Sequence, residues 1–137
     1  MFFKSSENKK KENDLGKVAA LLIYAAKIDE NFTNEEEEII YQTLLKIGAD
    51  NEKIDEIIQI GKKIEENSNQ ILEFTKEVKN MSEKNKIKIV EALWRIIYSN
   101  KKADIFEANL MRRLSGLLYI DSKTMGFIKE KIKKENS

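Results

Sequence analysis

The strongest constraint on the fold comes from residues 14–28, DLGKVAALLIYAAKI. Apolar residues in this stretch cover most of the circumference of a helix rather than a single stripe. A helix that is apolar on nearly all sides must be covered by other parts of the chain. We therefore predict a central, largely buried helix here.

Residues 29–34 interrupt this pattern and precede a second predicted helix. Thr33 and Glu36 have the spacing of a capping box, in which the hydroxyl accepts from one free backbone N–H and the carboxylate returns to another. Glu35, Glu36 and Glu37 stand in the first turn, where the helix dipole favours negative charge. Gly48 is expected to end this helix.

Five more helices follow from apolar spacing and capping residues, and no proline interrupts any of them. Asp50, Ser82 and either Asp121 or Ser122 are expected to cap three of these helices. The sequence thus predicts an all-α protein of about seven helices. The apolar residues that mark the five later segments are Ile54, Ile57, Ile58 and Ile64; Ile71, Leu72, Phe74 and Val78; Ile87, Ile89, Val90, Leu93, Trp94, Ile96 and Ile97; Phe106, Leu110, Met111, Leu114, Leu117 and Leu118; and Met125, Ile128 and Ile132.

The chain of 137 residues is long enough for one domain with a real core, and 41% of it is hydrophobic. Residues 1–12 are polar and charged, and are expected to form a mobile N-terminal tail. Residues 13–137 are expected to form a single helical domain.

The absence of cysteine and histidine narrows the possible chemistry. Without cysteine there are no disulfides or thiolate sites, and without histidine the commonest general base is missing. No pair of acids or nucleophile beside a base stands out, so we expect a protein that is not an enzyme. Any bound metal would need oxygen ligands, which favours Ca²⁺ or Mg²⁺.

The sequence shows no 18-residue apolar run and no apolar signal core, so we expect a cytoplasmic bacterial protein that does not span a membrane. The net charge of +1 conceals an asymmetry, with a balance of −5 over residues 1–68 and +6 over residues 69–137. The negative half of one molecule can attract the positive half of another, which allows self-association. Nucleic acid is not expected as a partner, because the basic half also carries carboxylates and lacks interleaved aromatic residues.

Apolar positions and caps recur at an offset of 71 residues. This recurrence predicts two repeated three-helix units around a shared core, bridged by the helix near residues 70–80 and with their central helices in contact. The matched pairs include Val18 with Ile89, Leu22 with Leu93, Glu36 with Glu107, Asp50 with Asp121, and Ile57 with Ile128.

Two runs resemble the tellurite resistance protein B-like (TerB-like) family. Residues 21–36, LLIYAAKIDENFTNEE, are similar to its first motif, and residues 91–97, EALWRII, to its second central helix, with the order and spacing kept over residues 15–132. The family's Asp-Gly is replaced by Asp29-Glu30 and, in the second copy, by Asn100-Lys101. The resemblance implies a seven-helix fold. Some members of the family are linked to tellurite and general stress resistance, and metal binding has been proposed for their acidic face, so the resemblance implies the same possible roles here.

The first candidate site is the acidic loop after the central helix. Asp29, Asn31, Thr33, Glu36 and Glu37 supply oxygen atoms that could hold Ca²⁺ or Mg²⁺, although the EF-hand pattern is absent. The alternative is structural: Asp29 closes a turn, Thr33 and Glu36 form the capping box, and residues 35–38 form a solvated helix start.

Four further residues have a functional or a structural interpretation. Asp104 and Glu107 could hold a metal, but are favoured as an N-cap and its box partner. Trp94 is expected to pack in the core rather than to recognise a ligand. Arg95 is expected to pair with Glu91 or Glu36 and so to hold one repeat to the other.

These observations favour a non-catalytic TerB-like module that acts as a stress-response accessory or as a protein-interaction domain. The alternative is a weak Ca²⁺- or Mg²⁺-binding protein that uses the acidic loop. A self-associating structural protein is the third possibility.

Overall fold

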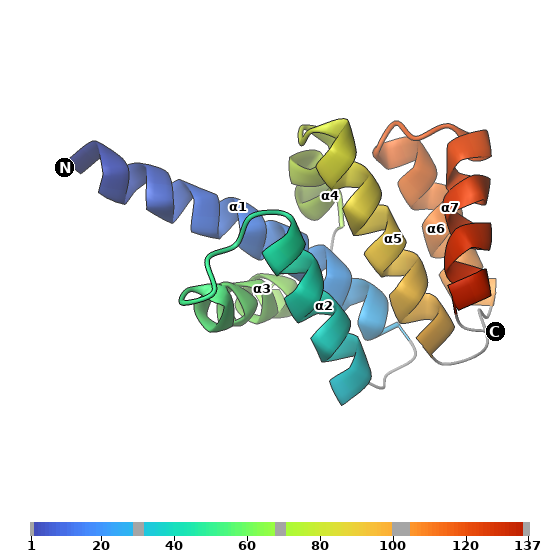
Figure 1. Ribbon diagram of the computed structural model, residues 1–137, viewed down its shortest axis with the longest axis horizontal. Helices are drawn as coiled ribbons and strands as arrows, with labels where there is room; N and C mark the ends of the chain where they lie inside the picture. Colours follow the sequence, from blue (N-terminus) through green and yellow to red (C-terminus); the bar gives the residue numbers. More distant parts are fainter. Residues whose placement is uncertain (1, 29–31, 68–70, 100–104, 136–137) are drawn as a thin grey trace.

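The computed structural model describes residues 2–28, 32–67, 71–99 and 105–135, and the side chains of these residues except at 2–8 and 105–107. These residues form seven helices and no strand, which confirms the all-α prediction (Figure 1). The helices are α1 (Phe2–Ala26), α2 (Asn34–Lys46), α3 (Ile54–Asn67), α4 (Leu72–Lys79), α5 (Glu83–Ser99), α6 (Ile105–Leu117) and α7 (Ser122–Glu135).

The C-terminal half of α1 is the predicted central helix. Val18, Leu21 and Leu22 are fully buried, and α1 contacts α2, α3, α4 and α5. The N-terminal part of α1 extends past the other helices (Figure 1). Residues 2–12, for which the sequence predicts a mobile tail, are thus helical, because good helix formers without a breaker let the helix continue toward Phe2. Their mobility stays a prediction.

Small residues bring α1 and α3 close together. A Cβ atom added at Gly61 would lie 2.6 Å from the Cβ of Ala19 and 3.1 Å from the carbonyl oxygen of Gly16. A Cβ atom added at Gly16 would lie 2.5 Å from the Cγ2 of Ile60. The two carbon–carbon distances, 2.6 and 2.5 Å, are far below van der Waals contact, so this crossing depends on the two glycines.

Two of the predicted caps are confirmed, and one is wrong. The Ser82 hydroxyl accepts the Asn85 N–H at 3.2 Å, and the Asp121 carboxylate accepts the Thr124 N–H at 2.7 Å. This bond to the backbone lowers the pKa of the Asp121 carboxyl. Asp50 does not cap α3, because a turn over residues 51–53 precedes the helix, which begins at Ile54.

The turns that end α2 and α6 are alike at the predicted offset of 71 residues. The N–H of Ala49 donates to the Leu44 carbonyl at 2.9 Å, and the N–H of Ile120 donates to the Ser115 carbonyl at 3.0 Å. In both halves the first helix also contacts the third, α1 with α3 and α5 with α7, and the central helices α1 and α5 touch. The equivalence of two whole repeated units stays a prediction.

Candidate functional site

The acidic loop after α1 is described only from Phe32 onward, so Asp29 and Asn31 lie outside the described residues. Thr33 caps α2, and its predicted capping box with Glu36 is confirmed. The Glu36 N–H donates to the Thr33 hydroxyl at 3.1 Å, and the Glu36 Oε1 accepts the Thr33 N–H at 2.8 Å and its hydroxyl at 3.0 Å. The two side chains therefore already support the start of the helix.

Burial separates Glu36 from its acidic neighbours. Only 1% of Glu36 is exposed, whereas Glu35 and Glu38 lie on the surface and Glu37 is half-buried. The Glu37 carboxylate lies 3.6 Å from the ammonium of Lys62 on α3. The expectation of a uniformly solvated helix start is thus wrong at Glu36, whose carboxylate faces the protein because the capping box turns it back toward Thr33.

The second predicted metal site lies at the start of α6. Asp104 and the side chain of Glu107 are outside the described residues, so their roles as cap or ligand stay predictions. Among the side chains that the structure describes, no three acids gather in a group that could hold a metal ion.

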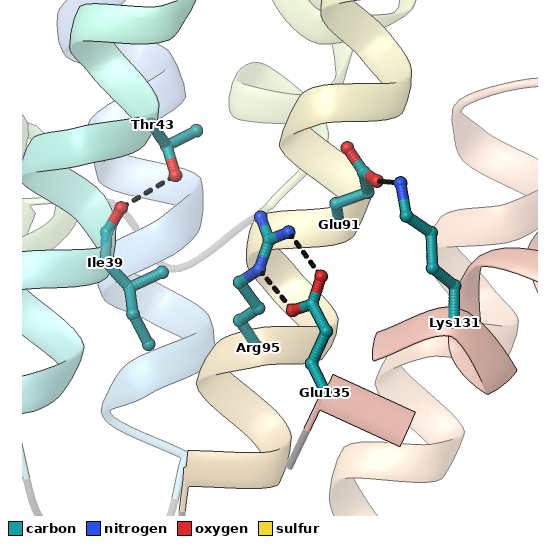
Figure 2. A network of polar contacts seen from close by, with 6 residues as sticks. All are labelled: Ile39, Thr43, Glu91, Arg95, Lys131 and Glu135. Carbon is teal, nitrogen blue, oxygen red and sulfur yellow. Dashed lines mark hydrogen bonds and ion pairs between the residues drawn. The ribbon is translucent and has the colours of Figure 1, made fainter. Parts of the chain in front are cut away.

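Arg95 joins α5 to α7 rather than one predicted repeat to the other. Its Nε and Nη2 donate to the two carboxylate oxygens of Glu135, at 3.0 and 3.1 Å (Figure 2). These hydrogen bonds raise the pKa of Arg95 and lower the pKa of Glu135. The expected pairing with Glu36 or Glu91 is wrong, because Glu91 accepts from Lys131 at 2.6 Å on the same α5–α7 interface.

Trp94 packs in the core, as predicted. It is 4% exposed, and its indole N–H lies 3.3 Å from the sulfur of Met125. Its ring stacks on Tyr98 at 5.8 Å between centroids, and the Lys129 ammonium lies 5.4 Å from its centroid. The contacts with Met125 and Lys129 hold α7 against α5, and together with Tyr98 they leave almost no indole surface for a ligand.

A surface hollow lies between α4 and α6. It encloses about 230 Å³, and α4 and α6 contact each other beneath it. Of the described residues, three large apolar ones are exposed, and two of these, Leu72 and Tyr119, line this hollow. We call it the α4–α6 groove; its lining residues are Leu72, Thr75, Lys76, Lys79, Gly116, Leu117 and Tyr119.

Tyr119 stands at the rim of the groove in a backbone conformation that tyrosine rarely adopts. Its φ is +56°, and the residue at the same place after α2 is Gly48, with a φ of +112°. Glycine is the usual residue at this position after a helix because it has no Cβ to clash. The chain thus holds an exposed tyrosine, with 72% of its surface accessible, where glycine would be less strained.

The charge on the groove is positive. Its lining includes Lys76 and Lys79 and no acidic residue. The Lys79 ammonium lies 4.7 Å from the centroid of the Tyr119 ring, which is within the range of a cation–π contact. Since the contact orients both side chains along one rim, the groove presents apolar surface next to fixed positive charge.

The sequence pattern does not predict this groove. Leu72 is expected on the apolar face of a helix, but it begins α4 and is 47% exposed. A signal was present at Tyr119, because the 71-residue offset aligns it with Gly48 and a bulky residue there breaks the pattern.

The groove places apolar side chains beside positive charge. Apolar side chains and two ammonium groups can hold an apolar group beside a negative charge.

Among the described residues, no helix combines the length and apolar content that crossing a bilayer requires.

Comparisons with known proteins give a clear result at the level of the family. No curated protein and no solved structure matches the chain. The model of the family described as "Tellurite resistance protein TerB" matches residues 16–130. Because the match covers most of the 137 residues and the structure is all-helical, the chain belongs to the TerB family.

Proposed function

We propose that this protein is a non-catalytic member of the TerB family that acts in the cytoplasm as a stress-response accessory by binding another protein. The observation that carries the proposal is the α4–α6 groove, where Leu72 and Tyr119 expose apolar surface in one hollow. Exposed apolar residues that share a concave surface favour protein binding more than scattered ones do.

The conformation of Tyr119 supports this role. A tyrosine in the left-handed region costs folding free energy, and most of its ring lies in solvent, where it recovers little of that cost by burial. Tyrosine is also enriched at the centre of protein interfaces, because its ring gives contact area with few rotatable bonds. A partner that covers the ring would account for the choice of residue.

Capture from the native host tests the proposal. Tagged full-length protein is compared with Leu72→Glu, and with Phe127→Ser as a matched control. Phe127 is 75% exposed on α7 and does not line the groove. Glutamate at position 72 stands in the first turn of α4, where the helix dipole tolerates it.

We expect the wild type and Phe127→Ser to capture the same protein, identified by mass spectrometry, and Leu72→Glu to lose it while its circular dichroism and Tm stay near those of the wild type. Equal capture by all three chains would contradict the proposal. So would capture that disappears after nuclease treatment, because a nucleic acid would then carry the interaction.

A further inference from the structure

We propose that the occupant of the α4–α6 groove is an acidic segment of a separate protein, with an apolar side chain that enters between Leu72 and Tyr119 and flanking carboxylates that meet Lys76 and Lys79. The inference rests on the proposed function and adds the chemistry of the partner. It follows from the charges of the lining, the distribution of exposed apolar residues and the shape of the hollow.

The lysines of the groove have no opposing charge in its lining. Lys76 is exposed and Lys79 is half-buried, with its ammonium held over the Tyr119 ring. The six ion pairs among the described residues use other lysines, at positions 27, 53, 62, 86 and 131, together with Arg95. A carboxylate that approaches this rim therefore meets positive charge without displacing an internal ion pair.

The volume of the groove fits one side chain and not a large ligand. About 230 Å³ is below the range of ordinary small-molecule pockets, which begins near 300 Å³. A single leucine or phenylalanine fits such a space, with Thr75 and Leu117 in the lining. A helix or strand that lies across the rim could then place its own acidic residues beside the lysines.

A second copy of this chain is a poorer occupant. Its acidic side, formed by α2 and α3, lacks an exposed large apolar side chain among the described residues. Its remaining protruding apolar residue is Phe127, and Lys123 and Lys131 stand four residues to either side of it on α7. Lys131 is already paired with Glu91, so docking Phe127 into the groove would bring Lys123 against the groove lysines.

Titration with defined peptides tests the inference on the full chain. The probe is a helical 14-residue peptide with two leucines four residues apart and four glutamates around them. Its control carries glutamine in place of each glutamate. Binding is followed by the amide chemical shifts of the ¹⁵N-labelled protein and by the anisotropy of a labelled peptide, at low and high salt.

We expect the acidic peptide to shift the amides of Leu72, Lys79 and Gly116, and its affinity to fall as salt rises. The double variant Lys76→Glu/Lys79→Glu should weaken binding about tenfold or more, since each rim charge changes from attraction to repulsion. Lys84→Glu is the matched charge control, because Lys84 is exposed on α5 outside the groove lining, and it should change the affinity less than twofold.

Any of four results would overturn the inference. Equal binding of the two peptides would show that charge does not select the partner, and shifts confined to other helices would show that the groove is the wrong surface. A concentration-dependent dimer whose interface shifts the same groove amides would identify a second copy as the occupant. If the peptides fail while capture from cells still depends on Leu72, the proposed function stands and the acidic chemistry falls.

Discussion

Replacing Gly61 by alanine tests the close approach of α1 and α3. The new Cβ would lie 2.6 Å from the Cβ of Ala19, 3.1 Å from the Gly16 oxygen and 3.2 Å from the Ala20 nitrogen. Two of these atoms belong to the backbone of α1, so a side-chain rotation cannot relieve the overlap and the helices must move apart.

The magnitude follows from two opposing effects. Overpacking of a dense core costs about 1–3 kcal/mol, and we take the upper part of this range, about 2–3 kcal/mol, because the overlap at Gly61 involves backbone atoms. Alanine is also a better helix former than glycine by about 1 kcal/mol. We therefore expect Gly61→Ala to lower the free energy of unfolding by about 1–2 kcal/mol, or roughly 3–8 °C in Tm for a chain of this size.

Gly126→Ala is the matched control, because Gly126 also lies within a helix and a Cβ there would have no neighbour within 4 Å. It should raise the free energy of unfolding by about 0.5–1 kcal/mol. Both variants are measured by urea unfolding followed by circular dichroism, with the m-value checked for constancy. A Gly61→Ala protein as stable as the wild type would refute the packing described for α1 and α3.

Three more predictions concern the turns and ion pairs. In thermal melts, Tyr119→Gly should raise the free energy of unfolding by up to about 1 kcal/mol, whereas Gly48→Ala should lower it by about 1 kcal/mol. A clear loss of stability in Tyr119→Gly would argue against backbone strain at Tyr119. Pairing with Arg95 lowers the pKa of Glu135, so the pair stabilises the folded protein fully above the unfolded pKa of about 4.3. This contribution is lost as the pH falls through the lower pKa of the folded state. Glu135→Gln should therefore reduce the free energy of unfolding by about 0.5 kcal/mol at pH 7 and should leave it unchanged near pH 2. Glu36→Ala should lower the free energy of unfolding, measured with urea, by about 1–2 kcal/mol. Millimolar Ca²⁺ or Mg²⁺ should move the Tm of the wild type by less than about 1 °C. A larger rise in Tm that Glu36→Ala removes would instead support the cation-binding alternative.

The helical fold could be predicted from the sequence because its determinants are local. The all-round apolar pattern at Val18–Ile28 and the Thr33–Glu36 spacing each specify structure within a few turns of helix. Gly48 ends a helix because few other residues adopt its backbone conformation easily. These features need no knowledge of how the helices pack.

The partners of charged and surface residues could not be predicted in the same way. Arg95 pairs with Glu135, which is 40 residues away, because α7 packs on α5, whereas the expected partners were Glu91 and Glu36. Leu72 matches the apolar pattern of its helix but begins it, so it remains exposed at the groove. Such outcomes depend on the angles between helices, which local sequence does not encode.

Site-specific photo-crosslinking in living cells tests the central claim, that the α4–α6 groove binds a protein partner. A photoreactive amino acid is placed at position 72, inside the groove, or at position 127, on the exposed face of α7. We predict one discrete protein adduct from position 72 and none of the same mass from position 127. Adducts of equal yield from both positions, or none from position 72 in cells that contain the folded protein, would contradict a binding role for the groove.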